Sequence, residues 1–522
     1  MDGHLDRIGL ARLKPQFFRN NVHQLWARPS FTKLQLLILF SITLIAILAR
    51  LYGLGDKPLW YDEVLTLWRA SLPLPNLLFD SFDNKHFPLY FWVVKPFSVV
   101  PWTEAYLRLP SVAFGALCAF LTGAIALRLG GSCAGFVAGI LMSLSPCEVQ
   151  YGQEARSYTL TSAAILLSLW GLVRLVDQFA PAAGTRPASH GSMAPWAAYV
   201  IGMNLALNTL GVAAPWFFAA NISVLAIHWC RRERDAPIRT WIWVNLATAM
   251  IWLPGILMIA TANYDAPLRG LHWTPAPSLE LTGQVLGALY MFRVADHTTF
   301  ELLPPAVPLL GPVLIGLASV GGWWLCRRPA VATILLAAAI TMPTAVAAIS
   351  IVHPIILPRY LLWSTGPYFI LVGLGVAALP RLLRSPTTMA LTFGGSVALM
   401  PYYDAETKPR WDQVAAYLQE HVQSQDGLIT NAGLSRVVIE AYMTRDGEPK
   451  PTILRHEGMG EIARKFEAGH TVWVIYGRAG QGSLEPAREF FARWIMFGNP
   501  TEKRSFGKHI VLARYDKKTP SD

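Results

Sequence analysis

The first residues in this 522-residue chain that could do chemistry are an acidic pair, Asp62 and Glu63. They follow two aromatic residues, Trp60 and Tyr61, and a carboxylate that is partly desolvated among aromatic rings tends to have a raised pKa. A raised pKa suits such a group to receive a proton, so Asp62 and Glu63 are candidate catalytic residues. Two plainer interpretations stay open: a solvated loop acid, and a cap at the start of a helix over residues 64–70.

Basic residues that each adjoin an apolar segment form a candidate anion site. Lys85 could hold a phosphate as a point charge and His86 as a switchable donor, although Lys85 could equally extend to a membrane surface. Arg359, which is followed by Tyr360, could bind a phosphate through two N–H groups or could only anchor a helix end.

The segment 151–158 carries the densest group of polar residues between two apolar runs. If those runs cross a membrane, Glu154 and Arg156 must pair or line a wet cavity, and Arg156 then joins the candidate phosphate site. The alternative is an ion pair between these two residues or with Arg108. Candidates for a cavity or an acceptor site are Tyr61, Tyr90, Tyr151, Gln153, Glu154, Tyr158 and His353.

The composition indicates whether these residues belong to a water-soluble protein or to a membrane protein. Apolar residues make up 53% of the chain and charged residues 15%, and the mean hydropathy is +0.36, whereas a soluble chain carries about a quarter charged residues. The sequence therefore predicts a polytopic α-helical membrane protein with about 11 spans, and more if re-entrant segments cross. The expected spans are 33–54, 108–128, 132–150, 158–176, 196–212, 213–230, 239–260, 303–325, 330–352, 359–379 and 386–402.

The distribution of Lys and Arg predicts the orientation of these spans. Short loops rich in Lys and Arg stay in the cytoplasm, and Arg128, Arg231 and Arg327 fall in alternate loops after a basic segment, 1–32. The N-terminus is thus predicted to be cytoplasmic, and the first outer loop, 55–107, and the tail, 403–522, to be extracytoplasmic. All the candidate residues above then share one side of the membrane.

Two apolar stretches, 87–100 and 278–292, are not counted as spans. The first is short and interrupted by Lys95 and Pro96, and a crossing there would place the later basic loops outside. Both are predicted to be interfacial or re-entrant.

The tail is predicted to be a small soluble α/β domain. The expected strands are 427–430, 452–454, 471–476 and 509–513, and the expected helices are 411–423, 436–443, 461–466 and 486–494. This alternation favours a partly parallel sheet. The glycine-rich segment 477–482 lacks the Lys-Ser/Thr pair of a phosphate loop, which argues against nucleotide binding.

Taken together and in order, these pieces resemble the GT-C glycosyltransferases. The resemblance is specifically to the bacterial branch of glycosyltransferase family 39, which includes aminoarabinose, galacturonic acid and protein O-mannosyl transferases. It rests on the acidic pair in a long first outer loop and on the segments 85–90, 108–111, 145–146, 151–158 and 358–360.

The resemblance implies a transmembrane catalytic domain over 33–402 and a bacterial inner (cytoplasmic) membrane location. It also implies inverting transfer of a sugar from a polyprenyl-phosphate donor, on the periplasmic face, to an envelope acceptor. That acceptor could be lipid A or lipopolysaccharide, another glycolipid, a polysaccharide or a protein.

The same resemblance assigns roles to residues. Asp62 would orient and deprotonate the acceptor, and the donor phosphate would bind Lys85, His86, Arg156 and Arg359. Some relatives carry an aspartate near the position of Arg156, so a second acidic role would pass to Glu154 or be absent. No cofactor and no obligatory metal is expected.

Two other classes of function stay open. A transporter or flippase of polyprenyl-linked sugars would carry charges at mid-bilayer depth and internal repeats. A non-catalytic component of envelope assembly would tolerate the loss of Asp62. The net charge of +11 is accounted for by cytoplasmic loops that contact membrane lipids, so nucleic-acid binding is not predicted.

Overall fold

A computed structural model describes residues 31–99, 101–179, 193–231, 237–261, 275–297, 299–431, 433–445, 453–455, 459–477 and 487–517. The predictions for 1–30 and for the glycine-rich residues 478–482 lie outside this part of the chain.

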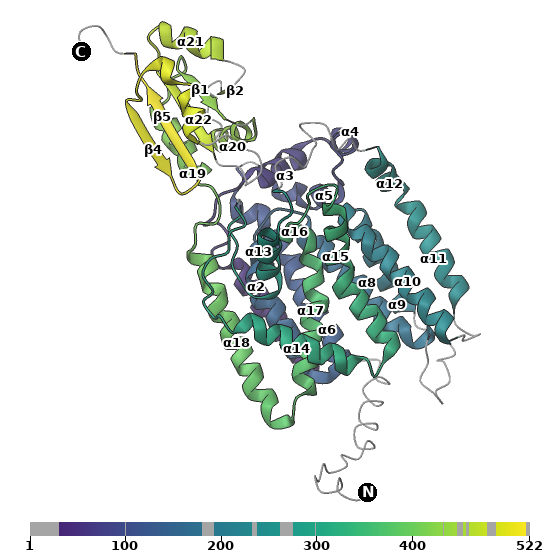
Figure 1. Cartoon of the computed structure of the whole chain (residues 1–522). Helices are drawn as coiled ribbons and strands as arrows, with labels where there is room; N and C mark the ends of the chain where they lie inside the picture. The colour runs from purple at the N-terminus through teal and green to yellow at the C-terminus, as the bar shows by residue number, and fades with distance from the viewer. Residues whose placement is uncertain are drawn as a thin grey trace, which may run out of the picture.

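The apolar segments form a bundle of helices, shown in Figure 1. Every predicted span overlaps helical residues, although the spans 132–150, 239–260 and 359–379 are each divided between two or more helices, and the span expected to begin at 303 becomes helical only at Leu310. The helices of the bundle are α2 (Lys33–Leu51), α6 (Glu104–Leu144), α7 (Pro146–Gly152), α8 (Tyr158–Phe179), α9 (Met193–Leu207), α10 (Ala214–Arg231), α11 (Ile238–Ile251), α12 (Leu253–Ala260), α14 (Leu310–Leu325), α15 (Pro329–Ser350), α16 (Pro358–Leu361), α17 (Thr365–Ala378) and α18 (Arg381–Asp404).

The lengths of these helices fit a membrane protein that crosses the bilayer several times. Within the described residues, six helices are long and apolar enough to span, or seven if α11 and α12, bent by 55°, form one broken span. Helix α6 runs for 41 residues but is interrupted at Gly131, whose φ of 81° lies in the region that glycine adopts without strain. This break falls between the predicted spans 108–128 and 132–150, so α6 contains the first span and most of the second, which ends in α7.

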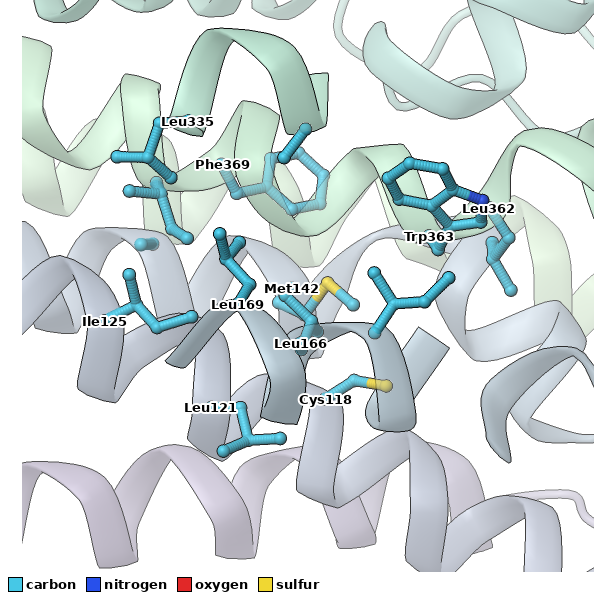
Figure 2. Close-up of a cluster of buried hydrophobic side chains, with 14 of the residues drawn as sticks. Cys118, Leu121, Ile125, Met142, Leu166, Leu169, Leu335, Leu362, Trp363 and Phe369 are labelled. Atoms are coloured by element: carbon cyan, nitrogen blue, oxygen red, sulfur yellow. The ribbon is translucent and has the colours of Figure 1, made fainter. Parts of the chain in front are cut away.

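Side chains from several helices fill the centre of the bundle. Figure 2 shows Leu121 and Met142 of α6 beside Leu166 of α8, with Trp363 and Phe369 on the opposite wall. All five are buried. Burial of side chains of this size stabilises a core by about 1.5–3 kcal/mol each in water, but between lipid-facing helices the gain comes mainly from close packing.

Neither of the two excluded stretches forms a helix long enough to cross. The described part of the first stretch, 87–99, contains only the short helices α5 (Leu89–Val94) and η1 (Lys95–Phe97), and residues 278–292 contain the twelve-residue α13 (Leu279–Tyr290). With α3 (Tyr61–Ser71) and α4 (Leu74–Asn84), α5 lies at the end of the bundle that carries the C-terminal domain (Figure 1).

The tail folds as an α/β domain with a five-stranded sheet in the order β2-β1-β3-β5-β4. The strands are β1 (Gly427–Thr430), β2 (Ile453–Arg455), β3 (Val472–Gly477), β4 (Glu502–Phe506) and β5 (Ile510–Tyr515), and the helices are α19 (Trp411–His421), α20 (Gly433–Met443), α21 (Met459–Glu467), α22 (Ala487–Ala492) and η5 (Ile495–Phe497). Strand β1 pairs parallel with β2 and β3, while β5 pairs antiparallel with β3 and β4. The partly parallel sheet is confirmed, and β4 is the strand that the sequence prediction missed.

The domain shares a hydrophobic core with the first outer loop. Val64 and Leu67 of α3 belong to the same buried cluster as Val438 and Ile439 of α20 and Trp411 of α19. The start of α3, which carries the acidic pair, therefore has helices of the tail packed against it.

Candidate active site

The acidic pair occupies the first turn of α3. Trp60 precedes the helix in an extended conformation, and Asp62 and Glu63 then lie near the N-terminal end, where negative charge is favoured by the helix dipole. Successive residues of an α-helix point about 100° apart. The two carboxylates therefore leave α3 in different directions, and their surroundings differ.

Asp62 faces two arginines from other parts of the chain. Its Oδ2 accepts a hydrogen bond from Nη1 of Arg359 at 2.9 Å and lies 4.0 Å from Nη2 of Arg156. Arg156 also donates to the backbone carbonyl of Asp62 and to Oγ1 of Thr66, each at 3.3 Å. The Asp62 side chain is 24% exposed, so it stays within reach of a ligand.

These arginines reverse the predicted pKa shift of Asp62. Burial opposes ionisation of the carboxyl group, but Arg156 and Arg359 outweigh it and hold the pKa below its usual 3.8. The expectation of a raised pKa is thus wrong. One carboxylate between two guanidinium groups leaves an excess of one positive charge, which suits the site to an anion.

Aromatic rings enclose the arginines. The guanidinium carbon of Arg359 lies 5.3 Å from the ring centre of Trp60 and 5.8 Å from that of Tyr360. Arg156 lies 5.7 Å from the ring centre of Tyr158. Stacking of this kind holds a guanidinium group in place through its face, while its N–H groups can form hydrogen bonds in the plane of the group.

Arg69 and His86 border the same cluster. Arg69 is buried and pairs with Asp80 at 2.7 Å. Burial, followed by the charges of Arg69 and Arg156, lowers the pKa of His86 to about 3. His86 is therefore neutral at pH 7, which corrects the expectation of a switchable cationic donor.

Glu63, in contrast, is fully enclosed. Its two oxygens accept from Nε and Nη2 of Arg108 at 2.8 and 3.0 Å, from Nζ of Lys408 at 2.8 Å, and from the backbone N–H of Ala155 at 2.9 Å. Burial disfavours its charge, yet Arg108 and Lys408 hold its pKa far below the usual range. With no exposed surface, Glu63 has no room for a substrate, and we assign it a positioning role in place of the expected catalytic one.

Glu154 pairs with a residue that the sequence prediction did not include. Its Oε1 lies 2.8 Å from Nε2 of His297, whose Nδ1 lies 2.8 Å from Nε2 of Gln150. Because the Gln150 amide donates to Nδ1, the hydrogen-bond network assigns the imidazole proton to Nε2, the ring nitrogen that lies next to Glu154. The ring of His297 also packs edge-on against Trp60 at 4.1 Å.

Other predicted residues bond elsewhere. Gln153 donates to the carbonyls of Arg50 and Tyr52 and accepts from Tyr402, so it joins helices. The Tyr90 hydroxyl bonds Ser111 at 2.7 Å.

Three more predicted site residues, Lys85, His353 and Tyr151, make contacts with residues other than Asp62. Lys85 donates to Oγ1 of Thr261 at 3.1 Å. His353 follows α15, where its backbone N–H donates to the carbonyl of Ile349. Tyr151 stacks edge-on with Tyr158 at 5.4 Å and so backs the aromatic wall.

The described residues hold no group of three or more His, Cys, Asp or Glu side chains placed to bind a metal ion.

Arg69, His297 and Lys408 are the site residues that the sequence prediction missed. Asp62, Thr66 and Arg69 are spaced i, i+4 and i+7, which places them on one face of a helix, so Arg69 could have been found. His297 and Lys408 come from loops and carry no such signal.

Comparison with known proteins finds the fold but no family. No protein-family model and no curated protein matches the chain. Among solved structures, apo ArnT from Cupriavidus metallidurans has a TM-score of 0.59 at 12% identity, covering 91% of this chain and 97% of that one. ArnT from the same organism bound to undecaprenyl phosphate gives 0.52 at 13% identity over the same shares.

A third structure, the apo oligosaccharyltransferase of Archaeoglobus fulgidus, has a TM-score of 0.50 at 10% identity and covers 85% of this chain and 69% of that one. These likenesses confirm the GT-C fold that the sequence resemblance predicted.

Proposed function

We propose that this GT-C-fold chain is an inverting glycosyltransferase that moves a sugar from a polyprenyl-phosphate donor to an envelope acceptor. The observation that carries the proposal is the position of Asp62, a partly exposed carboxylate held between Arg156 and Arg359 at one end of the bundle. The fold supports it, because ArnT, which has this fold, was solved with a lipid phosphate bound.

The donor phosphate would bind the two arginines. An incoming phosphate competes with Asp62 for Nη1 of Arg359, because both are anions and the guanidinium fork matches either. Once Arg359 is shared with the phosphate, the pKa of Asp62 rises toward its ordinary value. Donor binding would thus turn a weak base into a better one at the moment when it is needed.

The transfer itself balances as a single displacement. The acceptor oxygen attacks the anomeric carbon of the sugar, and its proton passes to Asp62. The bond between that carbon and the phosphate oxygen breaks, and its electron pair stays on the polyprenyl phosphate, where Arg156 and Arg359 stabilise the added charge. Trp60, Tyr158 and Tyr360 would exclude water, which would otherwise compete with the acceptor.

The shape of the pocket, and not a sequence motif, selects the sugar and the acceptor. The proposal therefore keeps all the acceptor classes of the sequence prediction: lipid A or lipopolysaccharide, another glycolipid, a polysaccharide or a protein. In this proposal the site faces the periplasm from the inner membrane.

The test is transfer by the purified chain in nanodiscs, with radiolabelled polyprenyl-phosphate sugars and host lipid, glycan and protein fractions as acceptors. Asp62→Asn is compared with Asp56→Asn, a matched loss of one exposed carboxylate in the same loop. Product from the wild type and from Asp56→Asn, but not from Asp62→Asn, supports the proposal. Equal product from all three removes Asp62 from the mechanism, and no product from any folded variant favours transport or assembly.

A further inference from the structure

The linker between α18 and α19, residues 405–410, crosses the site. The carbonyl of Ala405 accepts from Nζ of Lys57 at 2.6 Å, and the carbonyl of Thr407 accepts from the backbone N–H of His297 at 3.1 Å. Lys408 then donates to Glu63 at 2.8 Å. Three of its first four residues thus bond two different loops of the site.

The two loops that the linker bonds, the first outer loop and the loop that contains His297, both contact the surroundings of Asp62. Glu63 is the next residue along the chain, so Lys408 acts one residue away from the carboxylate of the site. His297 packs on Trp60, and Trp60 lies under Arg359, the hydrogen-bond partner of Asp62. The linker therefore supports Asp62 from one side and Arg359 from the other.

The C-terminal domain adds a further contact to the same loop. The backbone N–H of Leu59 donates to the hydroxyl of Tyr442 at 2.7 Å, and that hydroxyl donates to Glu104 at 3.1 Å. Lys57, Leu59 and Glu63 are thus all held by residues of the tail, within a stretch of seven residues that contains Asp62.

We infer that the linker is a positioning element for the reaction, with Lys408 as its central residue. This inference rests on the proposed function, because it concerns the same Asp62 and Arg359. Lys408 touches neither donor nor acceptor; it fixes the start of α3, and Thr407 fixes His297, so that carboxylate and guanidinium keep the separation that transfer needs. A misplacement of about 1 Å in such an arrangement can cost about 100-fold in rate.

The charge balance of the buried group makes Lys408 a usable test site. Glu63, Arg108 and Lys408 carry one negative and two positive charges, so Lys408→Met leaves a neutral, bidentate Glu63–Arg108 pair. Methionine also retains most of the unbranched side-chain volume. The variant should therefore fold. Tyr442→Phe is a second, milder variant, since it removes only the hydroxyl that bonds Leu59 and Glu104.

The matched control is Arg445→Met. Arg445 also joins the C-terminal domain to the first outer loop, by an ion pair with Glu104 at 3.3 Å and by its position 4.8 Å from the ring centre of Trp102. Its partners in these two contacts, Glu104 and Trp102, lie outside the linker 405–410. A general weakening of domain docking would affect this variant as much as Lys408→Met.

Two measurements are made on each full-length variant in nanodiscs: transfer kinetics with varied donor, and hydrogen–deuterium exchange of the segment 57–66. Lys408→Met is expected to lower kcat at least about tenfold, with a donor KM within about twofold because the phosphate ligands remain. Its exchange at 57–66 should rise. Tyr442→Phe should show the same pattern more weakly, and Arg445→Met neither change.

Unchanged kcat and exchange in Lys408→Met would overturn the inference. So would an equal loss of kcat in Arg445→Met, since the effect would then belong to docking as a whole. If the wild type itself transfers no sugar, the proposed function fails, while the exchange data still decide whether the linker holds the loop.

Discussion

Asp62 and Glu63 are neighbours in the chain, yet their environments are opposite. Asp62 is partly exposed and faces two arginines, whereas Glu63 has no exposed surface. Within the part of the chain that the structure describes, the Asp62 side chain makes one direct hydrogen bond to another side chain and Glu63 accepts four hydrogen bonds. The difference teaches that an acidic pair need not be a catalytic pair. One member is available to a substrate, and the other fixes the helix from which the first projects.

Asp62→Asn should give the largest effect on activity and little effect on stability. Loss of the general base that removes the proton of the acceptor hydroxyl lowers the rate by about 10²–10⁴-fold. The side chain is partly solvated, so the thermal midpoint should stay close to that of the wild type. Steady-state transfer assays and thermal unfolding of the same preparation check both halves, and a collapsed midpoint would show that Asp62 also holds the fold.

Glu63→Ala should do the reverse and damage the fold first. Removing one partner of a buried ion pair costs about 3–5 kcal/mol, because Arg108 and Lys408 would remain buried without their carboxylate. Thermal unfolding in detergent measures the loss. Asp412→Ala, which breaks a half-exposed pair with Arg410, is the control and should cost under about 1 kcal/mol; equal losses in the two variants would contradict the assignment.

Arg156→Gln should shift the pH dependence of transfer. In the wild type the arginines depress the pKa of Asp62, so its carboxylate form is present at neutral pH and is lost only as pH falls through that low pKa. Without Arg156, burial still opposes the charge while one compensating cation is gone, so the pKa rises. The acid limb of kcat/KM should then move to higher pH, whereas in Arg436→Gln, which breaks a partly exposed ion pair with Glu440 outside the linker, it should stay where it is in the wild type.

Lys85→Ala should have the smallest effect, with a donor KM within about threefold of the wild-type value. The ammonium group already donates to Thr261, a residue outside the cluster formed by Asp62, Arg156 and Arg359. Thr261→Ala removes the same hydrogen bond by deleting its acceptor, so its donor KM should equal that of Lys85→Ala. A large increase in donor KM in Lys85→Ala alone would restore Lys85 to the phosphate site that the sequence predicted.

Most of the fold followed from local patterns. Apolar runs set the helices of the bundle, and Gly427–Thr430 was expected as a strand because it is short and apolar. Strand β4 was missed because Glu502, Lys503 and Arg504 are charged, as edge strands often are, and show no alternation. The late start of α14 was missed because apolar residues before Leu310 looked like part of a span.

The site was only partly predictable, and distance along the chain explains which part. Asp62 could be recognised from its neighbours, but its pKa depends on Arg156 and Arg359, which lie 94 and 297 positions away. Lys408 lies 345 positions from Glu63. Local sequence cannot show which cation will meet which carboxylate, so the roles of Asp62 and Glu63 could not be separated before the fold was known.

The separation between Lys408 and Glu63 also bears on how the protein is made. The first loop leaves the ribosome long before its partner residue exists, and at roughly 5–20 residues per second the 345 intervening positions correspond to a delay on the order of 20–70 seconds. During that interval the helices can insert one after another while Glu63 has no lysine to meet. If the chain is the transferase proposed above, it would stay inactive during this interval, and the arrangement around Asp62 would be completed only when the segment that contains Lys408 folds back onto the first outer loop.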